Sequence, residues 1–186
     1  MRAWTLGLLM ATGLAIPVSL EAQPHDAMMA EADKYMYGEG VFDDVNRAAQ
    51  FYKQACAGGV QRGCAELATL LYYGPRHVSV SNVPRDEKRA AKLMKEAMPE
   101  LKAQCRAGDF RACNLQAFAY WTPLGVRHDL PRAVALYRTT CDKGHADACR
   151  VLGGMHLIGE GVPKDLRRTV ELYKKACDGA DATGCH

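Results

Sequence analysis

Beyond residue 22 the chain has little of what hydrolytic enzymes use. Only two serines stand there, Ser79 and Ser81, and neither has a lysine three residues later, as an S-x-x-K nucleophile requires. The six histidines are scattered, no H-E-x-x-H is present, and no C-x-x-C is available for thiol exchange. We therefore predict no catalytic residue, no metal site and no cofactor.

The chain also lacks a strong charge of one sign and, beyond its first residues, a long apolar run. A net charge of +3 is too weak to indicate nucleic acid or an anionic membrane as partner. The apolar stretch 6–16 follows Arg2, is interrupted by Pro17 and is too short to span a membrane. This favours a cleavable signal peptide over 1–22 rather than a retained anchor, with a domain at 23–186 and no membrane span after cleavage.

Cysteine is the residue type whose spacing is most regular. The eight cysteines form four pairs, each separated by eight positions. The last three pairs begin 36 residues apart, and the first gap is 49. An even number of cysteines in an exported chain indicates disulfides in an oxidising compartment, so we expect a periplasmic or secreted protein. The cysteines are Cys56, Cys64, Cys105, Cys113, Cys141, Cys149, Cys177 and Cys185.

The amino-acid sequence around each cysteine pair repeats as well. We call A the segment before the first cysteine of a pair, such as RAVALYRTTC, and B the segment that starts at the second, such as CRVLGGMHLIG. Apolar residues recur in A at helical spacing, and glycine follows the first three A segments, where a left-handed residue ends a helix. Small residues such as Ala68, Ala117 and Gly153 allow the B helices close approach. An aspartate stands three residues before the first arginine of each A segment, as a helix N-cap would: Asp44, Asp86, Asp129 and Asp165.

The N-terminal segment 27–37 reads as a B helix without an A partner, with Met28 in the position of the cysteine. The expected order is therefore B, A–B, A–B, A–B, A. In the second unit Met98 stands where a cysteine is expected, and Cys105 follows two helical turns later. We predict an A helix about two turns longer there, kinked or broken near Pro99, and a protruding loop over 73–85.

The cysteines of one unit lie at the two sides of a tight turn between helices. Their Cα atoms can approach disulfide distance there, so we predict bridges within units. Zinc is the alternative, and it is disfavoured because structural zinc sites use more closely spaced cysteines. The predicted bridges are Cys56–Cys64, Cys105–Cys113, Cys141–Cys149 and Cys177–Cys185.

The pattern of G-x-G-V, D-x-x-R, A-x-x-L-Y-x-x-A-C and a cysteine eight positions on resembles the Sel1-like repeat. The paired cysteines resemble its disulfide-rich branch, typified by the Helicobacter cysteine-rich proteins. The resemblance covers 27–186, with Pro123-Leu124-Gly125-Val126 as a departure from G-x-G-V. It implies an all-α fold, a superhelical α/α solenoid of TPR-like helix pairs stapled by intra-repeat disulfides.

The same resemblance implies a scaffold that binds a protein or peptide. The cysteine-rich branch is also associated with penicillin binding and slow β-lactam hydrolysis. A β-lactam or cell-wall fragment is therefore the alternative ligand, and weak β-lactamase activity the alternative function.

Two sets of basic residues recur at equivalent positions in the A segments. The first, which we call the cation row, is the candidate binding surface, although its members also suit the C-terminal half of a helix. The second, the arginine row, is expected to make local ion pairs with the cap aspartates. The cation row is Lys53, Lys95, Arg138 and Lys174, and the arginine row is Arg47, Arg89, Arg132 and Arg168.

The last A segment has no B segment after it, so part of its apolar stripe is expected to be exposed. We predict a contact through 166–178 with the partner or with a second copy of the chain. The tyrosines of the A segments are expected in the core, His145 in a solvated turn and His156 in helix packing. The stripe comprises Val170, Leu172, Tyr173 and Ala176, and the tyrosines are Tyr52, Tyr137 and Tyr173.

Overall fold

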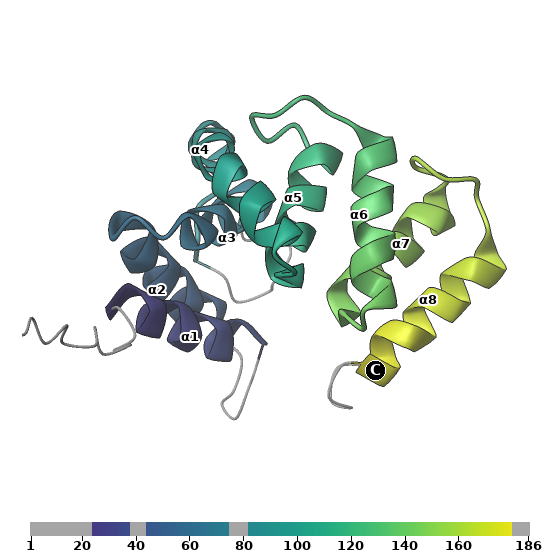
Figure 1. Cartoon of the computed structure of the whole chain (residues 1–186), viewed down its shortest axis with the longest axis horizontal. Helices are drawn as coiled ribbons and strands as arrows, with labels where there is room; N and C mark the ends of the chain where they lie inside the picture. Colours follow the sequence, from purple (N-terminus) through teal and green to yellow (C-terminus); the bar gives the residue numbers. More distant parts are fainter. Residues whose placement is uncertain (1–23, 38–43, 75–81, 180–186) are drawn as a thin grey trace, which may run out of the picture.

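The computed structural model describes residues 24–37, 44–74 and 82–179 (Figure 1). Within these ranges the regular structure is helical, and the helices follow the predicted alternation of B and A. The predicted signal peptide, Ser79 and Ser81, most of the loop 73–85, and Cys185 lie outside the described residues. The helices are α1 (Pro24–Tyr37), α2 (Val45–Ala57), α3 (Gln61–Tyr73), α4 (Glu87–Arg106), α5 (Phe110–Trp121), α6 (Leu130–Asp142), α7 (Ala146–Ile158) and α8 (Leu166–Gly179).

The helices stack one after another along a curved chain, with α1 and α8 at opposite ends (Figure 1). Each B helix packs most closely against the A helix that follows it. The packing between neighbouring units is therefore at least as extensive as the packing between the two helices of one unit, as in a solenoid. The all-α solenoid predicted from the repeat is confirmed.

The turn between A and B is the same in the first three units. Gly59, Gly108 and Gly144 take the left-handed conformation there, with φ of 90°, 97° and 91°. Only glycine adopts this region without steric cost, so these three positions end their helices as predicted. The turn brings together the Cα atoms of the two flanking cysteines.

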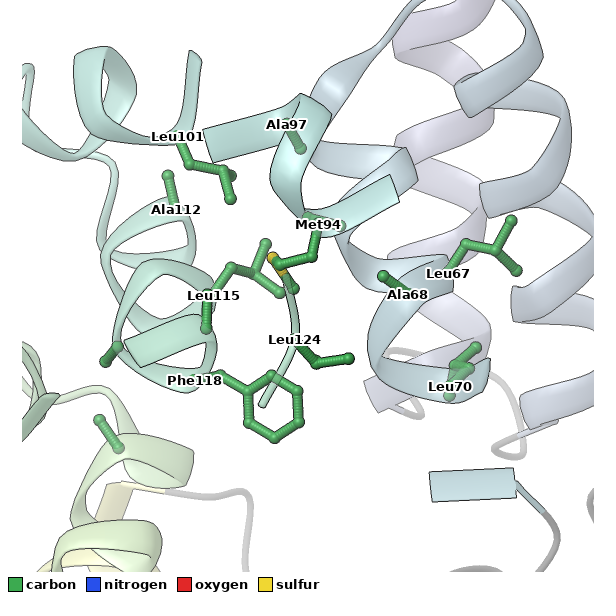
Figure 2. Packing of buried hydrophobic residues seen from close by; sticks show 14 of the residues in the cluster. Leu67, Ala68, Leu70, Met94, Ala97, Leu101, Ala112, Leu115, Phe118 and Leu124 are labelled. Carbon is green, nitrogen blue, oxygen red and sulfur yellow. The ribbon is translucent and has the colours of Figure 1, made fainter. Parts of the chain in front are cut away.

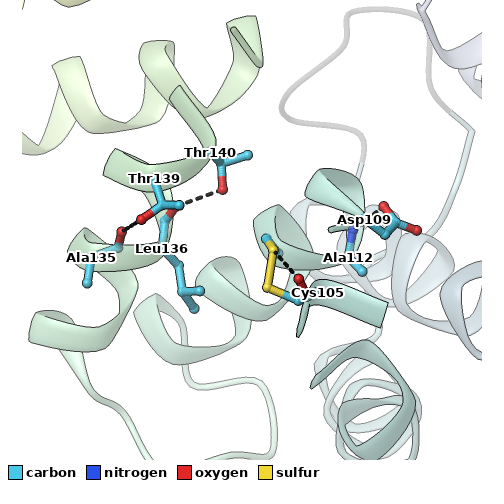
Figure 3. Close-up of a disulfide and its surroundings, with 8 residues drawn as sticks. Cys105, Asp109, Ala112, Ala135, Leu136, Thr139 and Thr140 are labelled. Carbon is cyan, nitrogen blue, oxygen red and sulfur yellow. Dashed lines mark hydrogen bonds between the residues drawn. A yellow bond between two sulfur atoms is a disulfide. The ribbon is translucent and has the colours of Figure 1, made fainter. Parts of the chain in front are cut away.

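Three of the predicted bridges are present in the structure. The Cα atoms are 4.5 Å apart in Cys56–Cys64 and 4.6 Å apart in both Cys105–Cys113 and Cys141–Cys149. Figure 3 shows the bridge at Cys105 beside the start of α5. The fourth bridge, Cys177–Cys185, includes a residue outside the described ranges and stays a prediction.

The B helices begin three residues earlier than the sequence indicated. They start at Gln61, Phe110 and Ala146 rather than at the second cysteine. At α5 the cause is a cap: Asp109 accepts a hydrogen bond from the Ala112 N–H at 3.0 Å (Figure 3). The second cysteine of each bridge consequently lies inside the first turns of its helix.

The four cap aspartates are confirmed. Each side chain accepts a hydrogen bond from the backbone N–H of the arginine three residues later, at 2.9–3.1 Å. The backbone N–H of each aspartate also donates to a carbonyl near the end of the preceding B helix, at 2.8–2.9 Å. Each cap aspartate thus closes the start of its own A helix with its side chain and ties that start to the preceding B helix with its backbone N–H.

Helix α4 has the predicted extra length. It contains 20 residues, whereas α2 and α6 contain 13 each, and Cys105 lies within it. The expected break at Pro99 is wrong, because the helix continues through this residue. A bend at Pro99 stays a prediction.

The departure at 123–126 leaves the repeat intact. Gly125 has φ 73°, close to the 72° of Gly161 in the G-x-G-V of the next unit. Leu124 is almost completely buried, and Figure 2 shows it among Met94, Phe118 and Leu70. The loop therefore adds an apolar side chain to the core between α3, α4 and α5.

A large residue on each A helix corresponds to a small residue on the B helix before it. A Cβ atom on Gly153 would lie 2.7 Å from the Tyr173 ring, so this tyrosine rests directly on the glycine. In the other units the small residue is an alanine with no exposed surface. The small residues are Ala32, Ala68, Ala117 and Gly153, and the large ones are Tyr52, Met94, Tyr137 and Tyr173.

We predict that peptide mapping of the unreduced protein will recover linked peptides only within units. The spacing of eight and the shared turn place no two cysteines of different units side by side. Mass spectrometry after digestion should also find the Cys177–Cys185 link, and a reduced sample is the control. Any linked pair from two units would contradict the prediction.

Candidate functional site

The cation row lies on the A helices, one residue to a unit. Lys53 is on α2, Lys95 on α4, Arg138 on α6 and Lys174 on α8, and all four side chains are exposed. None of them forms an ion pair or hydrogen bond with another described residue. These charges are therefore available to a partner.

The arginine row behaves differently. The Nε atoms of Arg47 and Arg132 lie 3.4 Å from the carboxylates of their cap aspartates. Arg168 pairs with Glu171 at 2.9 Å. Arg47 and Arg132 therefore make the expected pairs with their cap aspartates, whereas Arg168 pairs with Glu171 instead. The guanidinium of Arg89 makes no ion pair within the described part of the chain.

Lys53 and Arg89 line the same surface depression, although they come from different helices and different rows. The depression has a volume of about 380 Å³ and a mostly apolar wall. It lies between α2, α3 and the start of α4. Its other lining residues are Asn46, Ala49, Gln50, Leu67, Leu71, Asn82, Val83 and Pro84.

A carboxylate of α1 joins three other helices. Asp33 Oδ1 accepts a hydrogen bond from the Tyr52 hydroxyl at 2.9 Å, and Oδ2 accepts two from Arg62, each at 3.2 Å. Oδ2 also pairs with Arg111. Because Arg111 is on α5, this ion pair connects α1 with a B helix that is not its neighbour in the sequence of B helices.

Glu66 on α3 lies beside this cluster and is only 7% exposed. Burial, followed by the negative charge of Asp33, raises the pKa of its carboxyl to about 7. Arg62 and Arg111 lower the pKa and Asp147 raises it, but these effects are smaller. The carboxyl group is consequently near half-protonated at neutral pH.

A second polar group surrounds Asp147 at the start of α7. Its carboxylate accepts a hydrogen bond from Asn114 at 3.1 Å and pairs with Arg150. His145 caps this helix and is half-buried, and burial lowers its pKa. The prediction of a solvated turn for His145 is therefore wrong, whereas His156 contacts the Pro163 carbonyl at 3.2 Å, as a packed residue would.

Part of the apolar stripe on α8 is exposed, as predicted. Val170 is 67% exposed and Tyr173 37%, but Leu172 and Ala176 are buried. Tyr52 and Tyr137 are core residues as expected, and Tyr173 is the exception. A contact through 166–178 stays a prediction, and Val170 is the better position to test it, because a charge at Leu172 would disrupt the core.

Some of the residues that sequence analysis did not identify as functional still had a recognisable signal in the sequence. Asp33 is an acidic residue within the apolar stripe of α1, and arginine stands two residues before the second cysteine in two units, as Arg62 and Arg111. These pointed to an internal ion pair. Nothing in the sequence indicated that Asn82 and Arg89 would flank a depression.

The described residues contain no group of three or more histidine, cysteine, aspartate or glutamate side chains placed to hold a metal ion. No helix in the described ranges is both long and apolar enough to cross a membrane. The disulfides indicate an oxidising, extracytoplasmic compartment.

The chain belongs to the Sel1 repeat family. The model of the Sel1 repeat matches four times, at residues 26–60, 61–97, 102–145 and 146–181. The family comprises scaffolds for protein interactions. No curated protein matches the chain in sequence.

Three solved structures are similar to the chain. A protective antigen of uropathogenic Escherichia coli with an SLR fold is 19% identical over 85% of this chain and 39% of its own, with a TM-score of 0.44. A Sel1 repeat protein of Oxalobacter formigenes is 21% identical over 88% and 77%, with a TM-score of 0.45. Cysteine-rich protein B of Helicobacter pylori is 24% identical over 77% and 93%, with a TM-score of 0.42.

Replacing Asp33 with alanine should lower the free energy of unfolding by about 2–3 kcal/mol, because two arginines and a tyrosine hydroxyl lose their shared acceptor. Urea denaturation measures the change. The matched control is Asp142→Ala, whose pair with Lys175 is exposed and should contribute at most about 1 kcal/mol. Equal losses in the two variants would contradict a special role for Asp33.

Replacing Glu66 with glutamine should stabilise the protein above neutral pH. The raised pKa means that the wild type loses stability as pH rises from about 4.5, where the unfolded state ionises, through about 7. The variant should be more stable by about 1–3 kcal/mol at about pH 8, and the difference should vanish below about pH 4.5. Other carboxylates titrate in both proteins, so the difference between their urea curves isolates Glu66, and a difference independent of pH would refute the assignment.

Proposed function

We propose that this protein is an exported Sel1 repeat scaffold that binds a protein or peptide partner along its A helices, without catalysis. The repeat family supports the scaffold role. The observation that carries the proposal is the cation row: four exposed basic side chains at equivalent positions, none paired with a described carboxylate. A partner with acidic groups at a similar spacing would be attracted to this surface and held in register by it.

Export is supported by two independent features. The apolar stretch 6–16 after Arg2 has the pattern of a signal peptide. The three bridges need an oxidising compartment to persist. Together they favour a periplasmic or secreted protein.

No arrangement of the described side chains favours the alternative function. Neither serine beyond residue 22 has the S-x-x-K spacing of a β-lactamase nucleophile. We therefore do not propose β-lactam hydrolysis. Self-association through 166–178 would be compatible with the scaffold role, since Leu166, Val170 and Tyr173 present exposed apolar surface.

Reversing three charges of the cation row, in Lys53→Glu/Arg138→Glu/Lys174→Glu, should weaken partner binding about tenfold or more without unfolding the protein. The partner is first isolated by crosslinking in the protein's own cell envelope, and its affinity is then measured at several salt concentrations. The loss should be largest at low salt.

The control is Arg47→Glu/Arg132→Glu/Arg168→Glu, which changes the net charge equally at arginines that already pair with carboxylates. Far-ultraviolet circular dichroism checks that both proteins remain helical. If the two triple variants bind alike, the row has no specific role and only overall charge matters.

A further inference from the structure

The first unit has a depression that its sister units fill. In the second and third units a left-handed glycine four residues before the cap aspartate packs onto helix A. A Cβ atom on Gly125 would lie 2.2 Å from the Ala91 carbonyl oxygen, and one on Gly161 would lie 3.2 Å from Val134. Gly125 leaves no room for a side chain and Gly161 would make a tight contact, so in both units the loop packs closely on the helix.

In the first unit the equivalent residue is Asn82. Unlike glycine, it carries a side chain. No described residue other than glycine has a positive φ, so Asn82 does not adopt the left-handed conformation of Gly125 and Gly161. Its backbone N–H donates to Asn46 Oδ1 at 2.7 Å, so the loop is held at the side of α2 rather than on it. Ala49 occupies the position in the repeat that Ala91 and Val134 have in the other units. Because no loop glycine packs on Ala49, it lines the depression.

The floor of the depression is apolar. Ala49, Leu67, Leu71 and Val83 line it, and each is buried apart from the surface it presents there. Its volume of about 380 Å³ is at the small end of the range for ligand pockets. The depression can therefore take an apolar side chain and part of the chain that carries it.

The edge of the depression is basic. Lys53 and Arg89 line it, and neither pairs with a carboxylate of the described chain. Arg89 is the member of its row whose guanidinium makes no ion pair with a described carboxylate, and the nearby Glu87 pairs with Arg85. Two unpaired cations beside an apolar floor complement a ligand that carries a carboxylate next to an apolar group.

We propose that this depression binds an acidic, apolar segment of a partner polypeptide. An aspartate or glutamate carboxylate lies between Lys53 and Arg89, and a neighbouring leucine, isoleucine or phenylalanine side chain packs on Leu67 and Leu71. A simple inorganic anion would use the cations but leave the floor uncovered, whereas such a segment uses both. The inference rests on the proposed scaffold function and assigns a place and a chemistry to part of it.

The test is a selection of random peptides for binding to the immobilised, oxidised protein. The peptides are displayed at the N-terminus of a phage coat protein, so that they have no free C-terminus. Enriched peptides should carry aspartate or glutamate within two residues of a large apolar residue. Their synthetic, C-terminally amidated forms should bind Lys53→Glu/Arg89→Glu about tenfold or more weakly than the wild type by fluorescence anisotropy. The same peptides with a free C-terminal carboxylate show whether that group adds to or replaces the acidic side chain.

Two further variants separate the site from overall charge. Arg132→Glu/Arg168→Glu makes the same change in net charge at paired arginines and should keep the peptide affinity within about twofold. Ala49→Phe fills the floor without changing charge and should weaken binding as the double reversal does. Circular dichroism establishes that each variant is folded.

The outcomes distinguish this site from the scaffold role. If the enriched peptides bind all variants equally, or lack acidic residues, the depression is not the proposed binding site. Polypeptide binding by the scaffold then remains in place. If no peptide is enriched, the proposed role of the depression is also overturned, because the selection then contains no acidic, apolar segment that the depression binds. The scaffold role has its own test, the affinity for the crosslinked partner, which does not depend on the peptides.

Discussion

The packing constraint that recurs along the whole stack is a large residue on each A helix with a small residue at the equivalent position of the preceding B helix. Tyr173 rests on Gly153, and Tyr52, Met94 and Tyr137 are completely buried at the same position of their units. A larger residue on the B helix would push the next unit outward, since packed interiors have little free volume. The cap aspartates then fix the angle at which each A helix enters this contact.

Charge is divided between two sides of this packing. Arg62 and Arg111 both pair with Asp33, so that charges on three different B helices hold units together. The cation row projects from the A helices, where no carboxylate of the described chain neutralises it. Partly buried pairs of this kind are costly to break once one partner is removed, whereas exposed cations cost little to keep. The inner charges can therefore serve the fold while the outer ones remain free for recognition.

Periodicity made the fold predictable, and loss of periodicity limited what could be predicted about the site. Four equal cysteine spacings were enough to assign the helix order, the turn glycines and three bridges. The start of the B helices was misplaced because the second cysteine was taken as the first helical residue, whereas all three helices begin three residues earlier and only α5 has a side-chain cap, Asp109, to mark that start. Tyr173 was placed in the core by analogy with Tyr52, but the two tyrosines share only their position in the repeat, and Tyr173 is 37% exposed. The depression arises where Asn82 replaces a glycine, and one irregular residue does not reveal how far a loop stands from its helix.

The position of the bridges has a consequence for how the chain acquires them. Each closes a loop of a few residues between helices that are neighbours in sequence, so the two thiols of one unit meet far more often than thiols of different units. Correct pairing is therefore also the kinetically favoured pairing, and oxidation can proceed unit by unit from the N-terminus as the chain emerges into an oxidising compartment. Such a chain depends little on later reshuffling of its thiols, which is the slow step for proteins whose bridges join distant segments.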